Sequence, residues 1–150
     1  MRVANIGQSK MTQKKYKIGY TTGVFDMFHI GHLNILRRAK EQCEYLIVGV
    51  TTDELCFSRK QKYPIISENE RVEIVSAIKY VDKVVLQKHM DKISAVKEQG
   101  ANVVFVGSDW KGTPSWIKYE EELRTIGVDV VYLSHTDGIS STILREKLHK

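Results

Sequence analysis

Short apolar runs alternate along this chain with segments of helical periodicity. Five runs rich in Val, Ile, Tyr and Phe have the length and composition of buried strands, and they cover residues 17–22, 45–51, 83–87, 102–106 and 129–132. Four segments between them repeat their apolar residues at helical spacing, over residues 32–42, 68–80, 91–99 and 115–126. Gly100 and Gly127 stand where two of these helices should end.

Alternating strands and helices are typical of an α/β fold. We predict a Rossmann-like, doubly wound domain, with a five-stranded, mostly parallel sheet and helices on both faces. Ligands of such folds bind beyond the carboxyl ends of the strands, near the point where the strand order reverses. Residues 1–15 are polar and basic without periodicity, so we expect a flexible basic arm there and a single domain over residues 16–150.

Composition narrows the class of protein. With 150 residues, of which 42% are hydrophobic, the chain can bury an ordinary core. Cys43 and Cys56 lack metal-type spacing and are expected to be reduced packing residues. No apolar run approaches the roughly 20 residues that cross a bilayer, and the first residues lack a signal peptide's apolar stretch, so we expect a cytoplasmic protein with no membrane partner.

The net charge of +5 is spread along the chain instead of forming one basic face. That distribution does not favour a nucleic-acid partner. A few cations placed locally would be enough for a small phosphorylated substrate.

The sequence GVFDMFHIGH, residues 23–32, lies between the first predicted strand and the first predicted helix. Gly23 would allow a sharp turn, and Gly31 would let a phosphate approach the backbone N–H groups at the helix start. His29 and His32 are three residues apart and can donate hydrogen bonds to the same polyphosphate. Either histidine alone could be a surface or capping residue, and a zinc site would need further ligands nearby.

A second stretch, DGISST at residues 137–142, precedes a predicted short helix over residues 143–148. The hydroxyls and backbone N–H groups of Ser140, Ser141 and Thr142 would gather at the N-terminus of that helix, where phosphate binds well. The alternative is a plain N-cap, which needs only one of them. Two helix N-termini would then bracket one triphosphate.

These two stretches carry a family resemblance. The pattern G-x-F-D-x-x-H-x-G-H resembles the signature of nucleotidyltransferases, and TDGISST at residues 136–142 resembles the R-T-E-G-I-S-T-T segment of cytidylyltransferases. Residues 52–55 (TDEL), 70–71 (ER), 79–85 (KYVDKVV) and 107–110 (GSDW) also resemble family segments. The resemblance runs from about residue 16 to the end, and in length and wording the chain is similar to the bacterial glycerol-3-phosphate cytidylyltransferases.

The resemblance implies a reaction. Such an enzyme transfers CMP from CTP to a small phosphate monoester, here glycerol 3-phosphate, and releases CDP-glycerol and pyrophosphate. A phosphate monoester arrives ionised, so it can displace pyrophosphate in line without a general base. The resemblance also implies Mg²⁺ bound mainly through the nucleotide phosphates, and a homodimer.

The same resemblance implies the site residues. His29, His32, Lys60 and Arg71 would be catalytic, with Arg59 as the alternative to Lys60 and an exposed helix arginine as the alternative for Arg71. Asp26 would shape its loop by accepting backbone amides, and Trp110 would lie near the nucleobase unless it only packs in the core. The residues expected around the nucleotide are Thr22, Gly23, Val24, Phe25, Asp26, Gly31, Asp109, Trp110, His135, Thr136, Gly138, Ile139, Ser140, Ser141 and Thr142.

Two departures from the pattern leave alternatives open. His135 stands where cytidylyltransferases carry Arg, which predicts a weaker, pH-dependent phosphate contact. Residues 139–145 (ISSTILR) also resemble a segment of nicotinamide-mononucleotide adenylyltransferases, so an adenylyltransferase that uses ATP is the alternative within the fold. A nucleotide-binding protein without catalysis is the alternative from another class.

Overall fold

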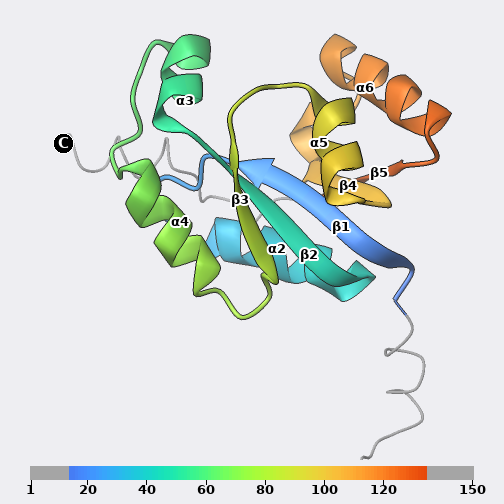
Figure 1. Cartoon of the computed structure of the whole chain (residues 1–150), viewed down its shortest axis with the longest axis horizontal. Coiled ribbons are helices and arrows are strands. Elements are labelled where there is room, and N and C mark those ends of the chain that lie inside the picture. Colours follow the sequence, from blue (N-terminus) through green and yellow to red (C-terminus); the bar gives the residue numbers. More distant parts are fainter. Residues whose placement is uncertain (1–13, 135–150) are drawn as a thin grey trace, which may run out of the picture.

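Five parallel strands form the centre of the protein in a computed structural model, which describes residues 14–134. The strands are β1 (Tyr16–Gly23), β2 (Cys43–Thr51), β3 (Lys83–Gln87), β4 (Val103–Gly107) and β5 (Asp129–Leu133). Their order in the sheet is β3-β2-β1-β4-β5, and every pairing of neighbours is parallel (Figure 1). The predicted Rossmann-like fold is confirmed.

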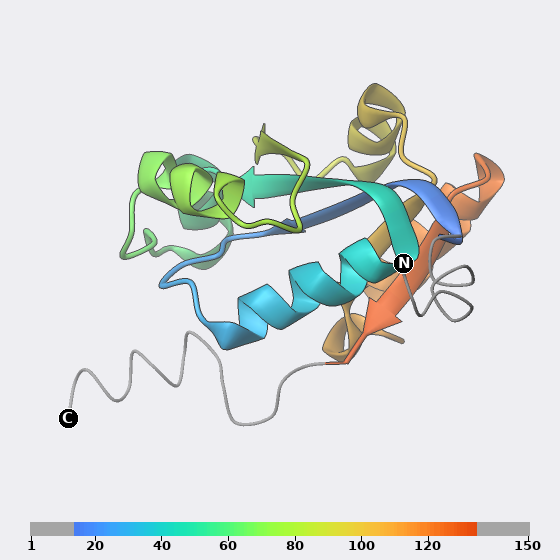
Figure 2. The ribbon, with the colours of Figure 1, turned by 90° about the horizontal axis from the view of Figure 1, so that it is seen from below.

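Helices cover both faces of this sheet. They are α2 (Ile30–Gln42), α3 (Asp53–Lys60), α4 (Glu68–Ser76), α5 (Lys92–Gln99) and α6 (Pro114–Thr125), with a short 3-10 turn η1 (Ser108–Trp110) after β4. One core cluster joins the sheet to α2 and α4, and a second joins it to α5 and α6. Figure 2 shows α2 and α5 on opposite sides of the sheet. The strand order therefore reverses between β1 and β4, which is where this fold binds ligands.

Helix α3 was not predicted as an element of its own. The sequence features that favour this helix are nevertheless local. The Thr52 hydroxyl caps it by accepting the Leu55 N–H. Two acidic residues stand in its first turn and two basic residues in its last turn. Helix α4 ends at Ser76, before the predicted end at residue 80, since the next residues leave the helix in tight turns. Ile78 and Val81, which follow the helix, still pack on the α2 side of the core, so the apolar spacing in the sequence continues beyond Ser76.

The parallel register brings the carboxyl ends of the strands to one edge. Gly23 at the end of β1 pairs with Val50 near the end of β2, and Thr21 pairs with Phe105 of β4. The Thr21 hydroxyl also donates a hydrogen bond of 2.9 Å to the Phe105 carbonyl. Loops that follow β1, β2 and β4 consequently start side by side. Among the helices of residues 14–134, none is long and apolar enough to span a bilayer.

Candidate active site

A cleft of about 450 Å³ opens at the carboxyl ends of β1 and β4. Its walls come from the β1–α2 loop, the end of α3 with the loop after it, and the η1 turn, which are far apart in the sequence. Of the residues predicted for the site, Thr22, Gly23, Val24, Phe25, Asp26, His32, Lys60 and Trp110 line this cleft. Its size suits a nucleotide-sized ligand.

His29 and His32 form a capping pair at the start of α2. The His29 ring Nδ1 accepts the Gly31 N–H at 3.0 Å, and the His29 backbone N–H donates to Nδ1 of His32 at 3.2 Å. The two rings stack with their centroids 3.9 Å apart. Capping and phosphate binding are therefore compatible here, because each ring has only one nitrogen in the cap. The Gly31 N–H, which we expected to face a phosphate, is already donated to His29.

The capping bonds determine which nitrogen carries the proton. A ring nitrogen that accepts an N–H cannot itself be protonated, so both histidines carry their proton on Nε2. Burial lowers the pKa of His29, and burial followed by the neighbouring His29 lowers the pKa of His32 to about 4. Both rings are neutral near pH 7. Nε2 of His29 is buried, and no acceptor among the described residues pairs with it.

The loop before α2 turns at Phe25 and Met27, both in the left-handed region with φ of 55° and 51°. Such angles in non-glycine residues cost free energy and are concentrated at functional sites. Gly23 was expected to make the sharp turn, and that prediction is wrong, since its φ is not in the left-handed region. At Gly23 the close contact is with the Phe25 ring, which would lie 3.0 Å from an added Cβ and would have to shift slightly.

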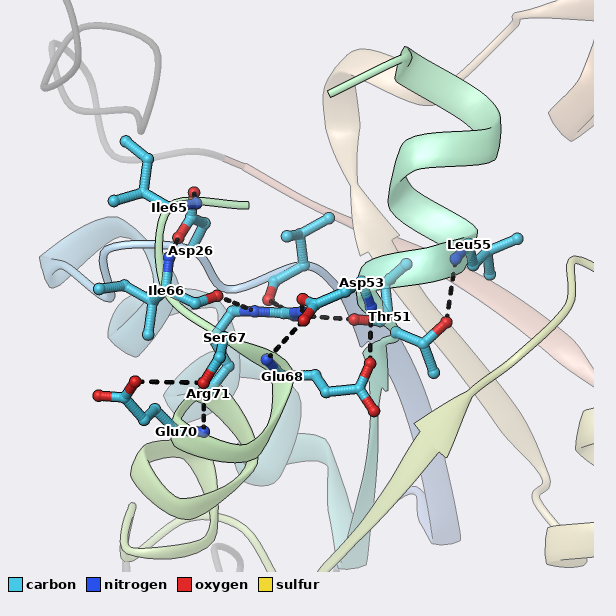
Figure 3. Close-up of polar contacts among 12 residues, drawn as sticks. Asp26, Thr51, Asp53, Leu55, Ile65, Ile66, Ser67, Glu68, Glu70 and Arg71 are labelled. Carbon is cyan, nitrogen blue, oxygen red and sulfur yellow. Dashed lines mark hydrogen bonds and ion pairs between the residues drawn. The ribbon is translucent and has the colours of Figure 1, made fainter. Parts of the chain in front are cut away.

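Asp26 holds this loop to another one. Its carboxylate is 2% exposed and accepts the backbone N–H groups of Ile65 and Ile66, each at 2.9 Å (Figure 3). Asp26 thus does accept backbone amides, and they belong to the loop between α3 and α4. The link places that loop, with Lys62 and Tyr63 on the cleft, against the β1–α2 loop.

Arg71 lies beneath the cleft and not on its wall. It is 1% exposed, so the interpretation as an exposed helix arginine is wrong. Its guanidinium donates to the carbonyls of Ile66, Val24 and Thr51 at 2.7 to 2.8 Å and forms an ion pair with Asp53 at 2.5 Å (Figure 3). These bonds use four of its five N–H donors, which leaves one Nη2 proton for the predicted phosphate contact.

The cations on the cleft come from the end of α3 and the residues after it. Lys60 lines the cleft, whereas Arg59, the alternative to it, does not. Lys62 also lines the cleft and was not predicted as a site residue. Its position, two residues after Lys60, was the feature of the sequence from which it could have been predicted. Two ammonium groups at one wall are suited to a polyphosphate ligand.

Trp110 is 44% exposed and lines the cleft from η1, so core packing does not explain it. Asp109 precedes it on the same turn and is exposed without lining the cleft. The remaining predicted residues, His135, Thr136, Gly138, Ile139, Ser140, Ser141 and Thr142, lie outside the described residues, as does the predicted helix over 143–148.

The predicted Mg²⁺ ion has no site built by protein side chains among the described residues. No group of three His, Cys, Asp or Glu side chains within residues 14–134 is arranged to bind one. The donors on the cleft are ammonium and imidazole N–H groups, which suit phosphate oxygens. These residues fit an Mg²⁺ ion that arrives on nucleotide phosphates.

Comparison with known proteins shows the family of this chain. The model of the cytidylyltransferase-like family matches residues 20–147. The chain is 38% identical over 129 residues to glycerol-3-phosphate cytidylyltransferase of Bacillus spizizenii, covering 85% of this chain and 94% of that protein. It is 34% identical over 126 residues to FAD synthase of Thermococcus sibiricus, covering 83% and 85%.

A solved structure shares the fold as well. The lipopolysaccharide core biosynthesis protein of Thermoplasma volcanium superposes with a TM-score of 0.68 at 27% identity, covering 81% of this chain and 97% of that one. The match of the family model spans the cleft, the histidine pair and both cleft lysines. The chain therefore belongs to the cytidylyltransferase-like family and is a nucleotidyltransferase.

Proposed function

We propose that this protein is a CTP:glycerol-3-phosphate cytidylyltransferase that forms CDP-glycerol and pyrophosphate. The observation that carries the proposal is the pair of neutral histidines at the start of α2, whose free N–H donors are both on Nε2, next to a cleft with Lys60 and Lys62. The choice of CTP and glycerol 3-phosphate is supported by the relatives that carry this name, at 35% to 38% identity.

The reaction needs no protein nucleophile. An oxygen of the acceptor phosphate attacks the α-phosphorus of CTP, and the bond from that phosphorus to the bridging oxygen of the β-phosphate breaks. The electron pair leaves with pyrophosphate, and no proton has to move because the acceptor oxygen is already ionised. The work of the protein is alignment and stabilisation of the negative charge that develops on the α-phosphate and the leaving group.

His29 does not line the cleft but stacks on His32, which does, and the two histidines divide this work with the cleft lysines. His29 and His32 donate Nε2–H bonds to phosphate oxygens, and since both rings are neutral with a pKa far below 7 for His32, they act as hydrogen-bond donors and not as proton acceptors. Lys60 and Lys62 supply full positive charges from the α3 side. The exposed Trp110 ring offers a stacking surface to the base. Mg²⁺ on the triphosphate would neutralise charge.

The test is a grid of CTP and ATP against glycerol 3-phosphate, choline phosphate, ethanolamine phosphate and flavin mononucleotide, with pyrophosphate release as the readout. We expect CTP with glycerol 3-phosphate to be turned over fastest. Binding of nucleotide without turnover on any acceptor would instead identify a non-catalytic nucleotide-binding protein.

The variant His29→Asn sharpens the assay. Asn is a good N-cap, so it can still accept the Gly31 N–H while the Nε2 donor is lost. We expect turnover to fall by roughly a hundredfold or more with little change in folding, by analogy with loss of one oxyanion donor. His89→Gln, at an exposed histidine outside the cleft, is the control and should keep full activity.

A second candidate is transfer of AMP from ATP to flavin mononucleotide. Phe57 and Tyr63 stack at 4.5 Å with an interplanar angle of 19°, are 37% and 65% exposed, and Tyr63 lines the cleft. A flat exposed aromatic pair suits a planar acceptor such as a flavin. FAD synthases are among the relatives. The reactions with ATP and flavin mononucleotide in the grid test this candidate, and Tyr63→Leu should lower that activity only if the flavin stacks on Tyr63.

The homodimer that the family resemblance implies stays a prediction.

A further inference from the structure

Lys92 is a buried cation beside the nucleotide cleft that no part of the mechanism above uses. It is the first residue of α5 and is 5% exposed, on the opposite side of the sheet from the histidine pair. Among residues 14–134, no carboxylate forms an ion pair with it. A buried ammonium without a counter-ion is costly, so an anion that enters the neighbouring cleft would stabilise it.

The contacts of Lys92 aim it at the end of β1. Its Nζ donates to Oγ1 of Thr22 at 3.1 Å, and the ammonium lies 5.6 Å from the centre of the Trp116 ring. Thr22 is one of the cleft residues, whereas Lys92 is not. The Thr22 hydroxyl therefore connects Lys92 to the cleft.

This bond sets the direction of the Thr22 hydroxyl. Because Oγ1 accepts from the ammonium, its own proton points elsewhere and can be donated to an acceptor in the cleft. The neighbouring ammonium polarises that O–H and strengthens the bond that it donates. Thr21, the preceding residue, differs because its hydroxyl is already donated to the Phe105 carbonyl.

We infer that Lys92 is a positioning residue for nucleotide binding, which orients the Thr22 hydroxyl as a charge-assisted donor to a phosphate oxygen of the nucleotide and contributes its positive charge from beneath the cleft. This inference rests on the proposed function, since it needs a nucleoside triphosphate in the cleft. Groups on both faces of the sheet would then bind the triphosphate, with the histidine pair on one face and Lys92 on the other.

The charged surroundings of Lys92 make the role measurable by pH. Burial, followed by the charge of Arg59 on α3, lowers the pKa of Lys92 to about 8. From α6 it meets the uncharged Trp116 ring, from β1 the Thr22 hydroxyl, and on its own helix the carboxylate of Asp91 is used to accept the Ser94 N–H. A bound anion raises the pKa of a neighbouring ammonium, so nucleotide binding should take up a proton near pH 8.

The experiment is calorimetric titration of the full chain with CTP and Mg²⁺, repeated with ATP, without acceptor, in two buffers of different ionisation heat. We expect uptake of about half a proton at about pH 8 in the wild type and none in Lys92→Met, whose dissociation constant should be roughly tenfold higher. Lys97→Met, which removes the same charge from an exposed site on α5, should behave as the wild type.

Coupling to Thr22 is measured in the same titration. Thr22→Val should also weaken binding roughly tenfold, whereas Thr22→Ser should bind as the wild type does, and the loss of binding free energy in the double variant should be smaller than the sum of the two single losses. Unchanged affinity and proton uptake in Lys92→Met, or additive losses in the double variant, would overturn the inference while nucleotide binding by the wild type still supports the proposed function. A wild type that binds neither CTP nor ATP would overturn both.

Discussion

The Arg71 guanidinium and the Asp53 carboxylate form an ion pair of 2.5 Å that joins the start of α3 to α4 beneath the cleft. Asp53 and Glu68 strengthen this junction, because each donates its backbone N–H to the other's carboxylate. Since Arg71 also binds three backbone carbonyls, the cleft walls after β1 and β2 depend on one buried side chain.

We expect Arg71→Met to lower the free energy of unfolding by about 3 kcal/mol, because three carbonyls and one carboxylate lose their donor. Arg71→Lys should recover little of this, since one ammonium cannot reproduce the guanidinium fork. Urea denaturation measures both. The control is Arg124→Met at an arginine 74% exposed with a 3.9 Å contact to Glu120, where a change within about 0.5 kcal/mol is expected. Equal effects of the two substitutions to Met would contradict the assigned role.

The two neutral histidines make stability depend on pH. His32 has a pKa of about 4 in the folded protein and about 6.5 when unfolded, so the unfolded chain binds the extra proton first as pH falls. The free energy of unfolding should therefore fall between about pH 6.5 and pH 4, by at most roughly 3 kcal/mol from His32, and should not depend on His32 above that window.

Denaturant titrations at several pH values measure this slope, and His32→Gln should reduce it, since Gln can serve at the same capping position without titrating in this range. If His32→Gln kept the full slope, the burial assigned to His32 would be wrong.

Lys60 lines the cleft and Arg59 does not, so the two residues should differ in their effect on catalysis. Lys60→Met should lower kcat/KM by about a hundredfold, because it removes a charge from the wall that faces the phosphates. Arg59→Met, at the adjacent exposed residue, should lower it by less than about tenfold. Steady-state pyrophosphate release measures both variants. A larger loss from Arg59→Met would reverse the assignment.

Asp26 should act through the loop that it holds. In Asp26→Asn only one oxygen remains to accept the N–H groups of Ile65 and Ile66, so one half-buried donor loses its partner. We expect the free energy of unfolding to fall by about 1 to 3 kcal/mol and KM for nucleotide to rise as Lys62 moves. Asp91→Asn is the same chemical change at an N-cap where Asn serves equally well, and it should leave the free energy of unfolding unchanged. A loss confined to kcat would argue against this role.

The strands and the position of the histidine pair could be predicted from the sequence alone. All five strands were predicted within two residues of their observed bounds, because a buried parallel strand is a short continuous apolar run. The histidine pair was placed correctly at the turn from β1 into α2, where His29 is the N-cap and His32 is in the first turn of the helix, since its spacing and its position after a strand are local properties of the chain. Helix α3 was missed although its caps are local too, because it is short and follows β2 almost directly.

Only the tertiary structure decided which charges serve the cleft. Lys92 reaches Thr22 across 70 positions of sequence, and Arg71 reaches Val24 across 47. Periodicity reports which face of an element is apolar, and it carries no information about which distant backbone a long cationic side chain will meet. The crossover connections bring the starts of α4 and α5 to the carboxyl edge of the sheet, and this placement decides which groups the two cations contact. Arg71 is buried there as a support of the cleft walls, and Lys92 is buried there beside the cleft.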